Sequence, residues 1–303
     1  MTRIVPAAAL ALVLACPILG SKPAAAAPEL KNDMIEFEYV EPRTAKYKPI
    51  YQHLKEIKLL ERLAQFLSPL KLQGGLVLSL EEGGPACRGP NSYYDMAGKL
   101  HLCYSWFYML ENEASVEVKR DPNEPFTSTS LGLMPGFTRS EVLIGGTVGV
   151  ILHEMGHALF DIQDIPLFGR EEDGADQIAA LIMLQFGPKV SLTTVKGFYN
   201  VWHHFNAEML RATKGQIRPW AEADEHSISI QRAYNFLCMA YGKDPQSFGA
   251  LAEQLLPRAR KQSCQEEYKQ AANAFRKTLL PDIDPEMMKA VLQLEILKPE
   301  DFK

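Results

Sequence analysis

The 303-residue sequence is poor in positive charge and contains no repeat or low-complexity segment. Lys and Arg number 32 against 37 Asp and Glu, the net charge is −5, and the basic residues form no extended run. Nucleic-acid-binding proteins concentrate basic residues in one patch or stretch, so we expect no nucleic acid as a partner. The absence of a repeat period excludes a solenoid. A composition with 47% hydrophobic residues is typical of a globular protein of one large or two small domains.

The start of the chain lacks an apolar run long enough for a membrane span. Residues 4–16 are mostly apolar, but a transmembrane helix needs roughly 20 such residues. One positive residue precedes this stretch and four alanines follow it at residues 24–27, which is the pattern of a cleavable signal peptide. We therefore predict a signal peptide over residues 1–26 and a single mature domain over residues 27–303. The mature chain is expected to be periplasmic or secreted, with no stable membrane span.

Cysteine is scarce, with five residues in the whole chain. Cys16 falls within the predicted signal peptide and follows an imperfect lipoprotein signal, so its lipidation stays open. Export to an oxidising compartment leaves four cysteines, an even number that favours two disulfides over buried free thiols. Three pairings are possible, and proximity in the sequence favours Cys87–Cys103 and Cys238–Cys264.

Histidine is scarce as well, yet two of the seven histidines form the motif H-E-x-x-H at residues 153–157. On a helix, residues four apart lie one turn above each other, so His153 and His157 can direct both imidazoles at one point. Zinc binds such nitrogens at about 2.0–2.1 Å, and a catalytic zinc has three protein ligands and one position for water. Glu154 would then lie beside that water, where a carboxylate can act as general base.

The third zinc ligand is expected from a second helix. The long metzincin motif is absent, because neither the glycine nor the third histidine follows His157 at the required spacing. The next helix is predicted over residues 171–186, which carry an apolar stripe before a Gly-Pro stop. Glu172 and Asp176 are four residues apart on this helix. One can therefore bind the metal while the other accepts a hydrogen bond from a ligand histidine.

The pattern E-x-x-x-D after H-E-x-x-H resembles the gluzincins, the thermolysin-like metallopeptidases. In that group the glutamate binds zinc and the aspartate orients a ligand histidine. The resemblance implies Glu172 as the third ligand and Asp176 as the residue behind a histidine. Because the interval from His157 to Glu172 is shorter than in thermolysin, Glu171 or Asp173 stays open as the ligand.

The chain more closely resembles a bacterial family of proposed metallopeptidases that is defined by sequence. The matching stretches span most of residues 76–242 and comprise residues 91–95, 102–104, 153–157, 171–176, 224–226 and 231–235. This resemblance implies an α+β, zincin-like fold. A small twisted sheet would pack on the H-E-x-x-H helix, and a mainly helical C-terminal half would follow.

Local patterns predict the elements of that sheet and its neighbouring helix. Alternating or apolar runs favour strands at residues 34–40, 76–80 and 99–104, and an amphipathic helix is predicted over residues 51–67. Zincins pair extended substrates with an edge strand, so the resemblance suggests residues 76–80 or 99–104 as that edge.

Two further patterns concern the zinc helix itself. Thr138 and Glu141 have the spacing of a capping box, which predicts the start of the helix. Gly145, Gly146 and Gly149 would each weaken the helix relative to alanine, so we expect another backbone to approach closely there.

One downstream histidine is a candidate hydrogen-bond donor to the transition state. A zinc hydrolase needs a cation or hydrogen-bond donor near the developing oxyanion. His226, oriented by Asp224, is a candidate for that role, as a downstream histidine is in thermolysin. In the alternative interpretation, Asp224 or Ser227 caps the following helix and His226 faces solvent.

These features predict an exported Zn2+-dependent metallopeptidase acting on a peptide or protein substrate. Zinc would polarise the scissile carbonyl and activate a water, and Glu154 would transfer the proton to the leaving amine. Two alternatives stay open: an exported zinc-binding protein without catalytic activity, and a zinc amidase acting on cell-wall peptides.

Overall fold

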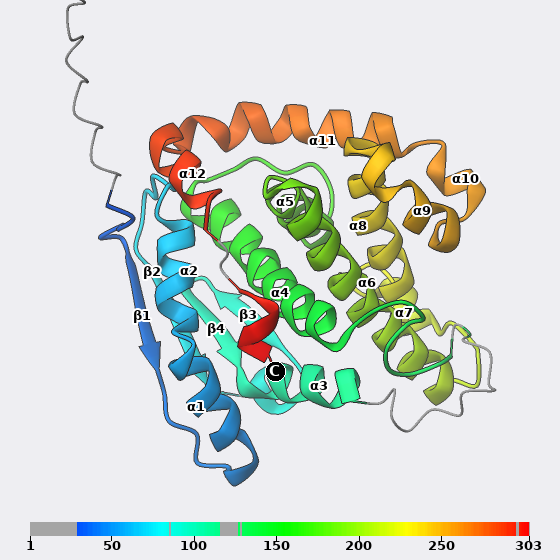
Figure 1. Ribbon diagram of the computed structural model, residues 1–303, viewed down its shortest axis with the longest axis horizontal. Helices are drawn as coiled ribbons and strands as arrows, with labels where there is room; N and C mark the ends of the chain where they lie inside the picture. Colours follow the sequence, from blue (N-terminus) through cyan, green and yellow to red (C-terminus); the bar gives the residue numbers. More distant parts are fainter. Residues whose placement is uncertain (1–28, 85, 116–126, 128, 295–296, 303) are drawn as a thin grey trace, which may run out of the picture.

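The computed structural model describes residues 29–84, 86–115, 127, 129–294 and 297–302, and the predicted signal peptide with Cys16 lies outside these residues. A four-stranded mixed sheet forms in the N-terminal part, and a mainly helical half follows it (Figure 1). The α+β class and the order of sheet and helices therefore agree with the prediction.

The sheet has the strand order β1-β2-β4-β3. The first three strands in this order run parallel, and β3 runs antiparallel to β4. The three predicted strands correspond to β1, β2 and β4. The bounds are Ile35–Tyr39 for β1, Leu76–Glu81 for β2, Ser92–Asp95 for β3 and Lys99–Cys103 for β4.

The expectation that residues 76–80 or 99–104 form the sheet edge beside the site is wrong. β2 and β4 both lie inside the sheet, and the edge on that side is β3. A tight turn at Gly98, with a φ of +85°, folds the chain back so that β3 pairs with the outer side of β4. β3 was not predicted from the sequence because its four residues are too few to show a periodic pattern.

The predicted helix over residues 51–67 is two helices, α1 (Lys48–Glu56) and α2 (Leu59–Leu67). Lys58 between them has a left-handed backbone with a φ of 55°, which no continuous helix can include. The break reorients α2, which buries Leu60 and packs against β1 and β2.

The H-E-x-x-H motif lies on α4 (Arg139–Ile162), the long central helix in Figure 1. The predicted capping box is confirmed, because Thr138 accepts a hydrogen bond from the Glu141 amide and Glu141 accepts one from the Thr138 amide. By length and composition α4 is apolar enough to cross a membrane, yet 94% of its 18-residue apolar window is buried. It is therefore a core helix.

α3 (Tyr104–Ser115), α5 (Glu171–Met183) and α6 (Gly187–Ala212) pack directly against α4. The C-terminal helices are α5 (Glu171–Met183), α6 (Gly187–Ala212), α7 (Pro219–Ala223), α8 (Ser229–Lys243), α9 (Pro245–Leu255), α10 (Arg258–Lys261), α11 (Cys264–Thr278) and α12 (Pro285–Val291).

The predicted close approach of another backbone is found at Gly145, where an added Cβ atom would lie 2.5 Å from Cα of Gly197 on α6. At Gly146 and Gly149 side chains approach instead, and a Cβ atom added at Gly149 would lie 2.2 Å from the ring of Phe198. The cost of glycine in the helix is thus compensated by dense packing around the motif.

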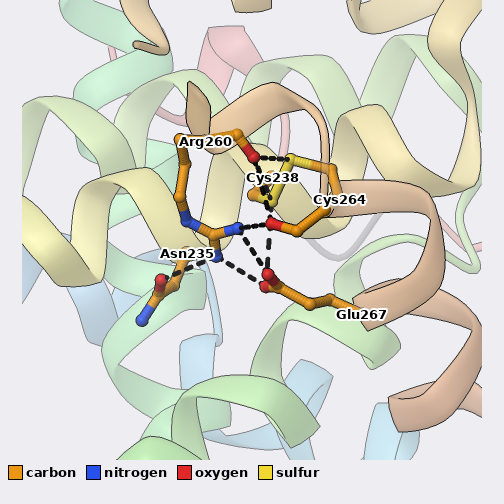
Figure 2. The surroundings of a disulfide bond; sticks show 6 residues. Asn235, Cys238, Arg260, Cys264 and Glu267 are labelled. Carbon is orange, nitrogen blue, oxygen red and sulfur yellow. Dashed lines mark hydrogen bonds and ion pairs between the residues drawn. A yellow bond between two sulfur atoms is a disulfide. The ribbon is translucent and has the colours of Figure 1, made fainter. Parts of the chain in front are cut away.

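Both predicted disulfides, Cys87–Cys103 and Cys238–Cys264, are present. The first fastens the loop before β3 to the end of β4. The second joins α8 to α11, and Arg260 beside it contacts both Asn235 and Glu267 (Figure 2). The disulfide and Arg260 thereby connect α8, α10 and α11.

Candidate metal centre

His153, His157 and Glu172 converge on one point between α4 and α5. The Nε2 atoms of the two histidines are 3.3 Å apart. Glu172 places Oε2 3.1 Å from Nε2 of His153 and Oε1 3.5 Å from Nε2 of His157. These three side chains form a group that could hold a metal ion.

A close contact between the two helices makes this convergence possible. A Cβ atom added at Gly156 would lie 2.7 Å from Cα of Ala175. Because Gly156 lies within the H-E-x-x-H turn and Ala175 lies one turn after Glu172, small residues face each other beside the site. Larger residues there would push Glu172 away from the histidines.

The two neighbouring acidic residues have other partners. Glu171 contacts Nδ1 of His157 at 2.8 Å, on the side of the ring away from the convergence point, and its side chain is 56% exposed. Asp173 accepts a hydrogen bond of 2.6 Å from Ser227. Among these three carboxylates, Glu172 alone belongs to the group with both histidines in the described part of the chain.

The donor set fits a zinc ion. Nδ1 of His153 faces Asp176 at 2.9 Å and Nδ1 of His157 faces Glu171 at 2.8 Å, so each ring uses its one neutral N–H on a carboxylate. Both Nε2 lone pairs then face each other and Glu172. Oε2 of Glu172 is buried and lies 3.1 Å from Nε2 of His153 and 3.1 Å from Nε2 of His226. Three converging acceptors require a cation, and zinc binds histidine nitrogen and carboxylate oxygen.

The pKa values of the metal-free site also indicate that the site requires a positive charge. Burial lowers the pKa of His153, but Asp176 and Glu172 outweigh this effect and raise the pKa to about 9. Burial raises the pKa of Glu172, but His153 and His157 outweigh it and hold that pKa well below its usual range. In the absence of metal, protons therefore supply the positive charge, and metal binding would release them.

Asp176 is buried behind His153 and is itself held by an arginine. Arg232 on α8 donates from Nε and Nη2 to the two carboxylate oxygens of Asp176, each at 2.7 Å. The guanidinium lies 3.7 Å from the ring centroid of Trp202. Sequence reasoning placed Arg232 in a stretch that resembles the family but gave it no role. Its place directly after Gln231 in that stretch gives no indication of which residue it would bind.

Glu154 is 6% exposed and lies next to the convergence point. Burial raises its pKa, while His153 and His157 lower it. The backbone amide of Tyr94 on β3 donates to Oε2 of Glu154 at 3.1 Å. The sheet edge and the candidate base are therefore in direct contact, which sequence reasoning missed together with β3.

His226 reaches the site from the segment between α7 and α8. Its Nε2 lies 3.1 Å from Oε2 of Glu172, and its Nδ1 lies 2.9 Å from Oδ1 of Asp224. Neither Asp224 nor Ser227 caps α8, whose N-cap residue Ile228 makes no side-chain cap hydrogen bond. The capping part of the alternative interpretation is therefore wrong, while the side chain of His226 is 43% exposed and also contacts Glu172.

These observations define a two-helix site with two histidines, a glutamate and a buried neighbouring carboxylate at the edge of a sheet. A family model described as "Putative metallopeptidase" matches residues 39–280, and the chain belongs to this family. No curated protein and no solved structure matches the chain significantly. The match extends from the end of β1 to the segment after α11, so it includes every residue of the site.

Proposed function

We propose that the protein is an exported zinc-dependent peptidase with a zincin-like active site. The observation that carries this proposal is the convergence of His153, His157 and Glu172 beside the buried Glu154. A closed structural zinc site would need a fourth protein ligand. Asp173 is engaged with Ser227, and His226 is not part of the group that His153, His157 and Glu172 form. A centre with three protein ligands supports catalysis over a purely structural role.

When bound, zinc would polarise the scissile carbonyl and acidify a water molecule. Glu154 takes a proton from that water and passes it to the leaving amine. The raised pKa of Glu154 makes it a better proton acceptor than an exposed carboxylate. In its protonated form His226 would donate from Nε2 to the developing oxyanion while its Nδ1–H is held by Asp224. Asp176 fixes the ring of His153 in the same way.

The edge strand supports a peptide as substrate. β3 borders a polar cleft of about 440 Å³ that contains His157 and Glu172. The amide of Tyr94 points to Glu154 and not to β4, so an extended peptide lying along β3 reaches the candidate base directly. Strand addition supplies affinity through main-chain hydrogen bonds that every peptide can form.

The disulfides support export. Cys87–Cys103 and Cys238–Cys264 would persist in an oxidising compartment and would be reduced in the cytosol of most organisms. Fractionation of cells that express the full chain tests this part of the proposal. The mature protein should be found outside the cytosol and should lack residues 1–26.

Metal analysis combined with peptide digestion tests the activity. Purified mature protein should contain one zinc per chain and cleave members of a peptide library. His153→Ala should lose both the zinc and the cleavage. A His153→Ala protein that retains full zinc occupancy would show that the ion is bound elsewhere.

A further inference from the structure

All three tryptophans of the chain line one cavity beside the candidate metal centre. The cavity has a volume of about 330 Å³, and His153, Glu154 and His226 are among the residues that line it. Three tryptophans from three separate segments of the chain therefore meet at a single place. Their arrangement suggests a binding surface for an apolar group next to the reacting atoms.

Trp106, Trp202 and Phe205 form an aromatic wall of this cavity that packs against other helices. Trp106 on α3 is 4% exposed, and its Nε1 donates to the carbonyl oxygen of Gly146 at 3.2 Å. Phe205 on α6 contacts both tryptophans, because its ring centroid lies 5.9 Å from that of Trp106 and 5.8 Å from that of Trp202. Trp220 on α7 is 63% exposed and also lines the cavity. The inner wall is thus packed against other helices, while Trp220 is accessible to solvent.

Two charged groups that line the cavity, Arg232 and Asp224, already have partners. Arg232 contributes to the lining, but Asp176 holds its guanidinium with two hydrogen bonds and Trp202 covers it. Asp224 faces His226 at 2.9 Å. An acidic side chain entering this cavity would lose its hydration and find the one lining guanidinium already engaged, whereas an apolar side chain would gain from burial.

The cleft on the other side of the metal centre has the opposite character. It is lined by Arg170, Glu171 and Glu225 and has a volume of about 440 Å³. His226 borders both spaces. A peptide that crosses the centre therefore meets a polar surface on one side of the scissile bond and an aromatic surface on the other.

We infer that the tryptophan-lined cavity selects a large apolar or aromatic side chain, such as Phe or Leu, on the residue that flanks the scissile bond. This inference rests on the proposed peptidase function and specifies its substrate class. Pro90 and Asn91, directly before β3, line the cavity, whereas the polar cleft extends along β3 and is lined from Asn91 to Met96. If a substrate strand pairs antiparallel with β3, the residue after the scissile bond enters the cavity.

Binding can be measured without catalysis. The Glu154→Gln variant of the zinc-loaded mature protein is titrated with capped alanine hexapeptides that carry one central Phe, Leu, Ala or Glu. Tryptophan fluorescence reports occupancy, because every tryptophan lines the cavity. Phe and Leu peptides should bind at least about tenfold more tightly than the Ala peptide, and the Glu peptide should bind most weakly.

Variants test whether the preference arises in this cavity. Trp220→Ala and Phe205→Ala should each reduce the ratio of Phe to Ala affinities by about threefold or more. Phe37→Ala is the matched control, because Phe37 is a 43% exposed aromatic residue on β1 at the opposite edge of the sheet. It should leave the ratio unchanged. A preference that survives both cavity substitutions would overturn the inference.

Digestion by the wild-type protein separates this inference from the proposed function. Cleavage next to Phe or Leu, identified by mass spectrometry, supports both. Cleavage without preference between the Phe and Ala peptides overturns the selectivity and leaves the peptidase function intact. Selective binding by Glu154→Gln combined with no cleavage by the wild type supports the cavity and contradicts the peptidase function. Equal affinity for Phe and Ala peptides overturns the cavity as a selective site.

Discussion

Arg232 holds both carboxylate oxygens of Asp176 at 2.7 Å, and Asp176 faces Nδ1 of His153 at 2.9 Å. All three side chains are buried. The charge on Arg232 contributes to keeping the pKa of Asp176 below its usual range even though burial raises it. Asp176 therefore stays ionised and accepts the Nδ1 proton of His153, which leaves Nε2 free to bind the metal.

We expect Arg232→Met to weaken zinc binding. Without the guanidinium, Asp176 loses its fixed orientation and no longer holds the ring of His153. Loss of such an outer partner typically lowers metal affinity by about 10–100-fold. Arg232→Lys keeps the charge but not the two parallel hydrogen bonds, so its loss should be intermediate. Competition with a fluorescent chelator measures the affinity.

Arg260 provides a matched control for this prediction. It also pairs with a carboxylate between helices, at 2.6 Å from Glu267, but lies beside the Cys238–Cys264 disulfide (Figure 2). Arg260→Met should lower the melting temperature without changing zinc affinity. Equal losses of zinc affinity in both variants would mean that general destabilisation, and not the orientation of His153, explains the Arg232 result.

The parts of the site that were predictable depend on local spacing. His153 and His157 are one helical turn apart, and Glu172 and Asp176 are also one turn apart, so residue patterns reveal them. Arg232 is 56 residues from Asp176, and no periodicity connects the two. Its role follows only from how α8 packs against α5.

The same limit explains the errors in the fold. A helical pattern continues through residues 51–67, and nothing in the side chains signals the left-handed conformation of Lys58. β3 has only four residues, and its place at the sheet edge follows from the turn at Gly98. Disulfide pairing was predictable because each pair is close in sequence, with separations of 16 and 26 residues.

Glu154→Gln should retain zinc and lose hydrolysis. Glutamine has nearly the same shape and can still accept a hydrogen bond from the amide of Tyr94, so the fold should persist. It cannot accept the proton of the water, and general-base catalysis contributes about 10²–10⁴-fold to rate. Elemental analysis and a peptide-cleavage assay on the same preparation measure both properties. Loss of zinc in this variant would identify Glu154 as a ligand and not the base.

Glu113→Gln should stabilise the protein at high pH. Glu113 is buried on α3 and accepts a hydrogen bond from Asn200, while Nδ1 of His204 lies 4.0 Å away. Burial raises the pKa of Glu113 well above its usual range, and the charge of Glu208 adds to this effect. The folded protein therefore keeps a proton that the unfolded chain releases above about pH 4.3.

The sign of the effect follows from proton binding. Above about pH 4.3 the folded state binds more protons at Glu113 than the unfolded state, so this residue lowers stability as pH rises. Glu113→Gln removes this loss of stability at high pH. Its melting temperature should be close to that of wild type at pH 4 and higher at pH 8, by about 2–4 °C per kcal/mol gained. The exposed Glu36→Gln serves as control, and an equal difference at both pH values would contradict the prediction.

His226→Ala should lower kcat and leave zinc in place. Nε2 of His226 lies 3.1 Å from Oε2 of Glu172, and His226 lines both the tryptophan-lined cavity and the polar cleft. If His226 donates to the oxyanion only in the transition state, its removal should lower kcat by about 10²–10³-fold with little change in KM. Asp224→Asn should lose part of the same rate, because Asp224 orients the ring.

The exposed Glu222→Ala, on the neighbouring α7, is the control for this prediction and should behave like wild type. Zinc content and melting temperature, measured on each variant, separate this role from two others. A drop in zinc content would make His226 a ligand, whereas a His226→Ala rate within about threefold of wild type would leave the histidine without a catalytic role.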